Sequence, residues 1–218
     1  MEIKYYQYFQ LFSLLMAILC RKGLNAFSLG ILIPILILDN VTEILGSNYL
    51  ALFHTHDNYF IYNIYFLLST PLFFLLFARM LGGTVREKRR LLWAGAAVEV
   101  FLFVNYFFIQ GWLDFDTFSA QLVSLACIIL SCFVLTRLAI RKDDEGGLLQ
   151  DPIFWVNAML LLFNLVSLIV LGIYKYIIQQ GLEISHKNLY LAIIPAANAV
   201  LYSGYSFAFL LCQLQTSK

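Results

Sequence analysis

Seven long apolar stretches, separated by short polar segments, dominate the chain. The stretches cover residues 5–20, 26–46, 59–81, 91–110, 117–140, 152–178 and 189–214. A membrane-spanning helix needs about 20 mainly apolar residues to cross roughly 30 Å of hydrocarbon. Continuous apolar runs favour helices over barrel strands, because apolar residues alternate along barrel strands. The pattern therefore predicts an all-α polytopic membrane protein whose single domain, residues 1–218, contains seven transmembrane helices.

The first stretch is the shortest of the seven. The residues before it, Met1 to Lys4, lack the clear positively charged region that begins a signal peptide. Its tyrosines Tyr5, Tyr6 and Tyr8 are typical of the aromatic belt at one membrane interface. We therefore interpret this stretch as a span.

Residues that begin and end helices lie between the stretches. Asp151 followed by Pro152 is typical of a helix N-cap with proline at the first helical position. The pair Gly82 and Gly83 lies where the third helix is expected to stop. This local pattern agrees with the predicted helices.

The basic residues divide unequally between the two sides of the predicted bundle. Eleven of the fourteen lysines and arginines fall on one side: Arg21, Lys22, Arg79, Arg86, Lys88, Arg89, Arg90, Arg137, Arg141, Lys142 and Lys218. Cytoplasmic loops carry the excess of Lys and Arg. We therefore expect the amino terminus outside, the carboxyl terminus in the cytoplasm and the protein in the inner membrane of the cell.

The composition supports this class and narrows the partners. Hydrophobic residues make up 61% of the chain and charged residues 12%, whereas soluble domains have about 45–50% and about 25%. The apolar surplus must face lipid, so the bilayer is the first expected partner. The net charge of +1 gives no indication of nucleic-acid binding.

Three carboxylates lie at membrane depth, where ionisable groups are costly. Asp39 and Glu43 are four residues apart and share one helix face, in the outer third of the second span if that helix begins at residue 26. Glu99 lies near mid-depth of the fourth span. Asn164 and Asn198 are its candidate hydrogen-bond partners.

The polar residues of the spans are concentrated in the outer half, which predicts an outward-facing polar pocket. The candidate ligand-binding or proton-relay residues are Asp39, Glu43, Asn63, Glu99, Asn105, Asn164, Asn198 and Tyr202. Two plainer interpretations remain open. Amides and hydroxyls in spans often only hold helices together, and Glu43 is near enough to the outer interface to reach it.

The evidence for catalysis and for cofactors is slight. His54 and His56 are candidate metal ligands in an outer loop, but their spacing is not a recognised zinc pattern. The chain contains no phosphate-binding glycine loop or nucleophile elbow. The sequence therefore favours a protein that is not an enzyme, with no catalytic residues and no cofactor.

Short polar motifs open several of the predicted helices. They are Asp39-Asn40-x-x-Glu43-x-x-Gly46, then Asn58 and Tyr62-Asn63, then Asp151-Pro152-x-Phe154-Trp155-x-Asn157. This arrangement resembles a group of small uncharacterised seven-helix bacterial inner-membrane proteins. Members of that group look like neighbours of two-component sensor kinases, so the resemblance implies a sensory or accessory signalling role. It implies no catalytic residues.

Three functions follow from these features. The leading hypothesis is a sensory or ligand-binding accessory module with an outward-facing polar pocket for a small or lipid-like ligand. Its membrane signalling partner would bind the cytoplasmic loops at residues 79–90 and 141–151. The first alternative is a proton-coupled transporter or permease that uses the same carboxylates. The second is a membrane-embedded metalloenzyme that acts on lipid.

Overall fold

The computed structural model describes residues 4–54, 58–111, 117–142, 147–179 and 183–216, with side chains except at 142 and 174–191. These residues are almost entirely helical and contain no strand. The longer helices are α1 (Tyr5–Leu19), α3 (Leu32–Ser47), α5 (Tyr59–Met80), α6 (Val85–Val104), α7 (Thr117–Lys142), α8 (Pro152–Gln179) and α9 (Glu183–Thr216). The short ones are α2 (Arg21–Ala26), α4 (Tyr49–Phe53), the π-helix η1 (Asn105–Ile109) and the 3₁₀-helix η2 (Leu148–Gln150). Each predicted stretch overlaps one long helix.

Within the described residues, five helices are long and apolar enough to cross a membrane: α5, α6 with η1, α7, α8 and α9. The protein is therefore built as a multi-pass membrane protein. Helices α1 and α3 contain 15 and 16 residues and are shorter than the roughly 20 residues that cross hydrocarbon.

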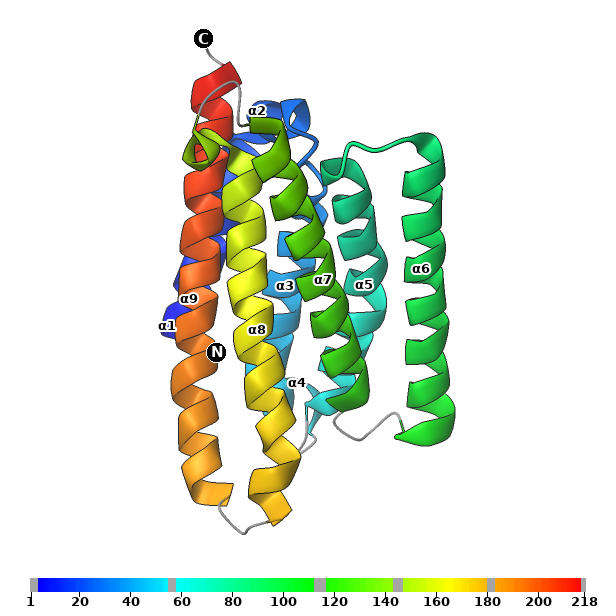
Figure 1. Cartoon of the computed structure of the whole chain (residues 1–218). Helices are drawn as coiled ribbons and strands as arrows, with labels where there is room; N and C mark the ends of the chain where they lie inside the picture. Colours follow the sequence, from blue (N-terminus) through cyan, green and yellow to red (C-terminus); the bar gives the residue numbers. More distant parts are fainter. Residues whose placement is uncertain (1–3, 55–57, 112–116, 143–146, 180–182, 217–218) are drawn as a thin grey trace.

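The contacts between helices join six of the long helices into a closed ring. In order around the ring, α1 packs on α3, α3 on α5, α5 on α7, α7 on α8, α8 on α9, and α9 on α1. Helix α6 lies outside this ring, packs mainly on α5, and stands at the edge of the molecule in Figure 1. Helix α6 adds to the hydrophobic core from outside the ring, through its fully buried Leu102.

The second predicted helix is not continuous, which corrects the expected span at 26–46. The chain forms α2, leaves the helix at Ser28 with a left-handed φ of 61°, and begins α3 six residues after α2 ends. A Cβ atom on Gly23 of α2 would lie 2.8 Å from the backbone carbon of Cys212 in α9. Glycine thus allows α2 to lie directly against the end of α9.

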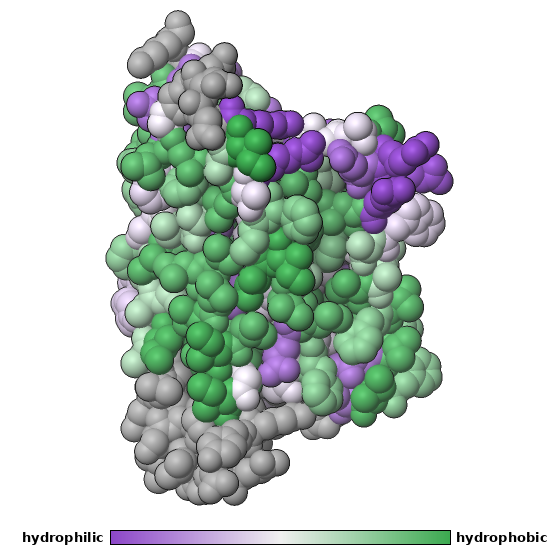
Figure 2. Space-filling view, viewed as in Figure 1, coloured by the Kyte–Doolittle hydropathy of each residue, from purple (hydrophilic) through white to green (hydrophobic). Residues whose placement is uncertain are grey.

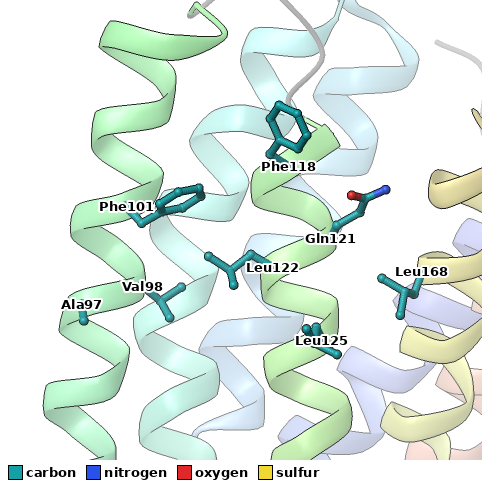
Figure 3. Close-up of a pocket in the computed structure, with 8 residues that line it drawn as sticks. All are labelled: Ala97, Val98, Phe101, Phe118, Gln121, Leu122, Leu125 and Leu168. Atoms are coloured by element: carbon teal, nitrogen blue, oxygen red, sulfur yellow. The ribbon is translucent and has the colours of Figure 1, made fainter. Parts of the chain in front are cut away.

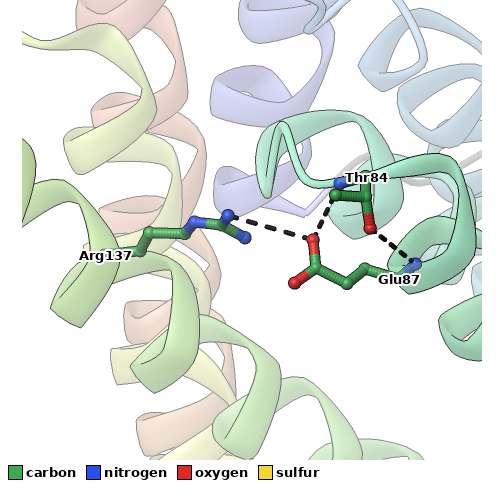
Figure 4. Close-up of polar contacts among 3 residues, drawn as sticks. All are labelled: Thr84, Glu87 and Arg137. Atoms are coloured by element: carbon green, nitrogen blue, oxygen red, sulfur yellow. Dashed lines mark hydrogen bonds and ion pairs between the residues drawn. The ribbon is translucent and has the colours of Figure 1, made fainter.

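Helix α6 begins six residues before the predicted start at residue 91. A capping box explains the difference: the Thr84 hydroxyl accepts from the Glu87 backbone N–H at 3.3 Å, and the Glu87 carboxylate accepts from the Thr84 N–H at 2.7 Å. Figure 4 shows Arg137 of α7 reaching the same carboxylate, 3.9 Å away. Because this ion pair is exposed to solvent, it contributes little to stability.

The outside of the molecule is apolar and its polar side chains are largely internal. Figure 2 shows a broad apolar surface around the middle of the helices, with hydrophilic residues at the end where α6 begins. That end carries exposed basic residues of α2, α5, α6 and α7. Twenty polar or charged side chains among the described residues are buried. The functional site is therefore sought inside the helix bundle.

Candidate functional site

The carboxyl group of Asp39 is the centre of a buried polar cluster inside the ring. The Tyr202 hydroxyl of α9 donates to Asp39 Oδ2 at 3.2 Å. The Gln10 side-chain amide of α1 donates to the Tyr202 oxygen at 3.2 Å. Tyr65 of α5 also forms a side-chain hydrogen bond with Asp39. These four residues, named the Asp39 cluster below, join four helices of the ring.

The packing of α1 against α3 sets the register of this cluster. The Asn40 amide donates to the Leu36 carbonyl at 2.7 Å and lies 3.5 Å from the Gln10 carbonyl. Asn40 thus brings Gln10 to the level of Asp39. Only 8% of the surface of Asp39 and 1% of the surface of Gln10 are exposed, so the cluster is shielded from solvent.

Several oxygens in and beside the cluster have no hydrogen-bond partner among the described residues. They are Asp39 Oδ1, Gln10 Oε1 and Ser13 Oγ, the last lying one helical turn from Gln10 on α1. A buried polar atom without a partner costs about 1–3 kcal/mol. The first two oxygens can only accept, so they suit a donor or a positive charge.

Glu43 lies in the contact between α1 and α3. The Tyr6 hydroxyl donates to its carboxylate at 2.7 Å, and the Gln7 amide donates to its backbone carbonyl at 3.1 Å. Tyr6 is therefore buried and is not part of an aromatic belt, whereas Tyr5 and Tyr8 are 56% and 60% exposed. Through these two hydrogen bonds, Glu43 holds α1 against α3.

Glu99 lies outside the ring on α6 and does not join the Asp39 cluster. Its Oε2 atom is buried and has no hydrogen-bond partner among the described residues. The Asn164 amide, an expected partner of Glu99, instead donates to the Leu160 carbonyl of its own helix at 2.8 Å. The three span carboxylates thus occupy different environments, and the structure does not bring them together.

The remaining candidate residues are buried at other positions. Asn105 donates to Ser119 Oγ at 3.1 Å and to Gln110 Oε1 at 3.0 Å, which connects η1 to α7. Asn63 is buried on α5, and Asn198 is buried on α9 one turn before Tyr202. Asn105 therefore has the helix-joining role that the plainer interpretation expects.

The candidate loop histidines give no metal centre in the described part of the chain. His54 is exposed and ends α4 in a left-handed conformation with φ of 55°, whereas His56 lies outside the described residues. The described residues contain no group of three or more His, Cys, Asp or Glu side chains placed to hold a metal ion.

A groove of about 640 Å³ lies between α6 and α7 and is apolar, unlike the expected polar pocket. In Figure 3, Phe101 of α6 and Leu122 of α7 lie on one side of α7, and Gln121 and Leu168 of α8 on the other. The groove contains none of the candidate residues. It faces the bilayer side of the ring and is separate from the Asp39 cluster.

Two contributors to the polar centre escaped the sequence analysis: Gln10 and Ser13. A signal for both exists, since the buried polar positions Gln7, Gln10 and Ser13 recur every three residues along α1. That spacing marks one helix face. Tyr65 lies near Asn63 on the third predicted helix, but nothing in the sequence shows that it meets Asp39.

Comparison of the chain with protein-family models, curated proteins and solved structures finds no match. The geometry of the Asp39 cluster is therefore the basis of the function proposed below.

Proposed function

We propose that this protein is a seven-helix module of the bacterial inner membrane that binds or senses a small ligand at the Asp39 cluster. Its amino terminus is outside and its carboxyl terminus is in the cytoplasm. A change at the cluster reaches the cytoplasmic ends of the helices, where a membrane signalling partner binds the basic loops.

One observation carries this proposal: a buried carboxyl group inside the bundle is shared by four helices of the ring. Tyr202 and Gln10 connect the Asp39 carboxyl to α9 and α1, and Tyr65 connects it to α5. Ionisable groups inside a membrane are costly and usually functional. A change of charge or ligand at this point alters contacts of four helices at once.

The grouping of basic residues supports the proposed orientation. In a variant whose four native cysteines are serine, a membrane-impermeant maleimide is expected to label His54→Cys in intact cells. Lys88→Cys is expected to react only after permeabilisation, because its end of the bundle carries the exposed basic residues. The opposite labelling pattern would overturn the orientation.

Trp155 provides a reporter for the sensing step. Its ring lies 5.0 Å from that of Phe207, which joins α8 to α9, and its indole N–H donates to the Leu149 carbonyl at 2.8 Å. With Trp93 and Trp112 replaced by Phe, its fluorescence in nanodiscs is expected to change as the pH falls from about 8 to about 4, the range in which carboxyl groups take up protons.

The Asp39→Asn variant is expected to lose this fluorescence change, because its side chain cannot take up a proton. Glu99→Gln is the matched control: it neutralises another carboxyl at membrane depth, outside the ring, and is expected to keep the response. An Asp39→Asn variant that responds like the parent protein would refute sensing through the Asp39 cluster.

A proton-coupled transporter is the second candidate. It is favoured by buried polar side chains that continue from the cluster toward the basic end, namely Ser13, Ser206 and Asn157. The Asn157 amide contacts Met80 Sδ at 3.3 Å, and its Oδ1 atom has no hydrogen-bond partner among the described residues. Substrate-driven proton uptake into proteoliposomes that requires Asp39 would support transport, and uptake that persists in Asp39→Asn would remove it.

A further inference from the structure

We infer that the Asp39 cluster binds a single alkali metal cation, held by Asp39 Oδ1 and Gln10 Oε1 inside the helix ring. This inference rests on the proposed function, because it names the ligand of the same site. It adds that the ligand is an inorganic monovalent cation.

The cluster contains two side-chain oxygens that lack a hydrogen-bond partner among the described residues. Asp39 Oδ1 and Gln10 Oε1 are acceptors, and neither has a hydrogen-bond partner among the described residues. Both side chains are more than nine-tenths buried, so bulk water does not readily compensate them. Carboxylate and amide oxygens are hard ligands, the kind that bind hard cations.

The charges around the Asp39 carboxyl group also favour a cation. The groups that face Asp39 are Glu43 on its own helix, Tyr65 on α5, and Tyr202 and Tyr205 on α9. Gln10 on α1 is uncharged. No described Lys or Arg side chain is buried, so the protein supplies no counter-charge at this depth. A bound cation would provide that charge.

The ligands and the charge of the site favour a monovalent ion over a divalent one. Calcium takes six to eight oxygen ligands, commonly from several carboxylates, and the Glu43 carboxylate is already bonded to Tyr6. A divalent ion beside Asp39 would leave an excess positive charge in a low-dielectric interior, which is costly. A proton would also neutralise Asp39, and the binding of radioactive ions described below tests which of the two the site holds. A monovalent metal ion matches the single negative charge of the Asp39 carboxylate.

The test is equilibrium binding of ²²Na⁺, and separately of ⁸⁶Rb⁺ as a probe for K⁺, to the purified full chain in nanodiscs at constant ionic strength. We expect saturable binding of one ion per chain at about pH 8. Asp39→Asn is expected to weaken binding about 100-fold or more, because the neutral amide removes the charge that pairs with the ion. Gln10→Leu is expected to weaken it at least several-fold.

Glu99→Gln is the control and is expected to bind like the parent protein, since Glu99 lies outside the ring. Absence of saturable binding of either ion to the parent protein would overturn the inference without any variant. Equal binding by the parent and Asp39→Asn, or loss in Glu99→Gln, would also overturn it. A pH-dependent Trp155 signal without cation binding would leave the proposed function standing and refute only the cation.

Discussion

The hydroxyl group of Tyr202 is predicted to stabilise the bundle by about 1–3 kcal/mol. In Tyr202→Phe, Asp39 Oδ2 loses a donor and the Gln10 amide loses an acceptor. In water-soluble proteins each such loss costs about 1–3 kcal/mol. Between membrane helices the measured average is about 0.6 and the maximum about 1.7 kcal/mol, because the separated helices also find partners. Two bonds on the membrane scale give the predicted range.

The assay is reversible unfolding in mixed micelles, followed by circular dichroism, for the parent protein and four variants. Tyr8→Phe is the matched control, because its side chain is exposed and the loss of its hydroxyl is expected to change the free energy of unfolding by less than about 0.5 kcal/mol. Asp39→Leu, which removes the acceptor of the Tyr202 hydroxyl, and the double variant complete a mutant cycle with Tyr202→Phe. A coupling energy of zero between Asp39 and Tyr202, or an equal effect of Tyr8→Phe, would refute the hydrogen-bonded cluster.

Three further predictions concern the helix contacts, each measured as the free energy of unfolding in the same assay. Gly23→Ala is expected to destabilise the protein by about 1–3 kcal/mol, since the new Cβ would lie 2.8 Å from the α9 backbone. In the control Gly172→Ala the nearest side-chain atom is 3.9 Å away, so this variant is expected to stabilise the protein by up to about 1 kcal/mol. Destabilisation by both variants would contradict the prediction. Asp151→Ala is expected to cost about 1 kcal/mol, because its carboxylate accepts from the Ile153 N–H at 2.8 Å at the start of α8, and Asp151→Asn should restore most of it. Glu43→Leu is expected to cost more than Glu43→Gln, which keeps an acceptor for the buried tyrosine hydroxyl of α1; equal costs would exclude that bond.

Helix positions followed from the sequence because lipid demands long apolar runs. A helix at 5–20 is confirmed by α1, although α1 is not among the helices long and apolar enough to span a membrane. The N-cap at Asp151 is confirmed by its bond to Ile153. The failures came from local chemistry. The break at Ser28 depends on a left-handed residue inside an apolar run, and hydropathy does not register it.

The site was predictable only in part. Asp39 and Tyr202 were recognised individually, because polar residues in spans are rare and costly. Their meeting was not predictable, since it depends on which helices are neighbours in the ring. Glu99 looked equivalent to Asp39 in the sequence, because both are carboxylates in predicted spans. The position of α6 nevertheless places Glu99 outside the ring.

The distribution of polar and apolar residues determines which substitutions the chain tolerates. At lipid-facing positions one apolar side chain replaces another at little cost, whereas interior side chains such as Gln10 and Tyr202 have defined partners and geometry. Relatives of this chain should therefore differ most in their leucines, isoleucines and phenylalanines and least in Gln10, Asp39, Tyr65 and Tyr202. In such a protein, the few polar residues inside the spans are a better guide to shared ancestry than the many apolar residues, which are replaced quickly.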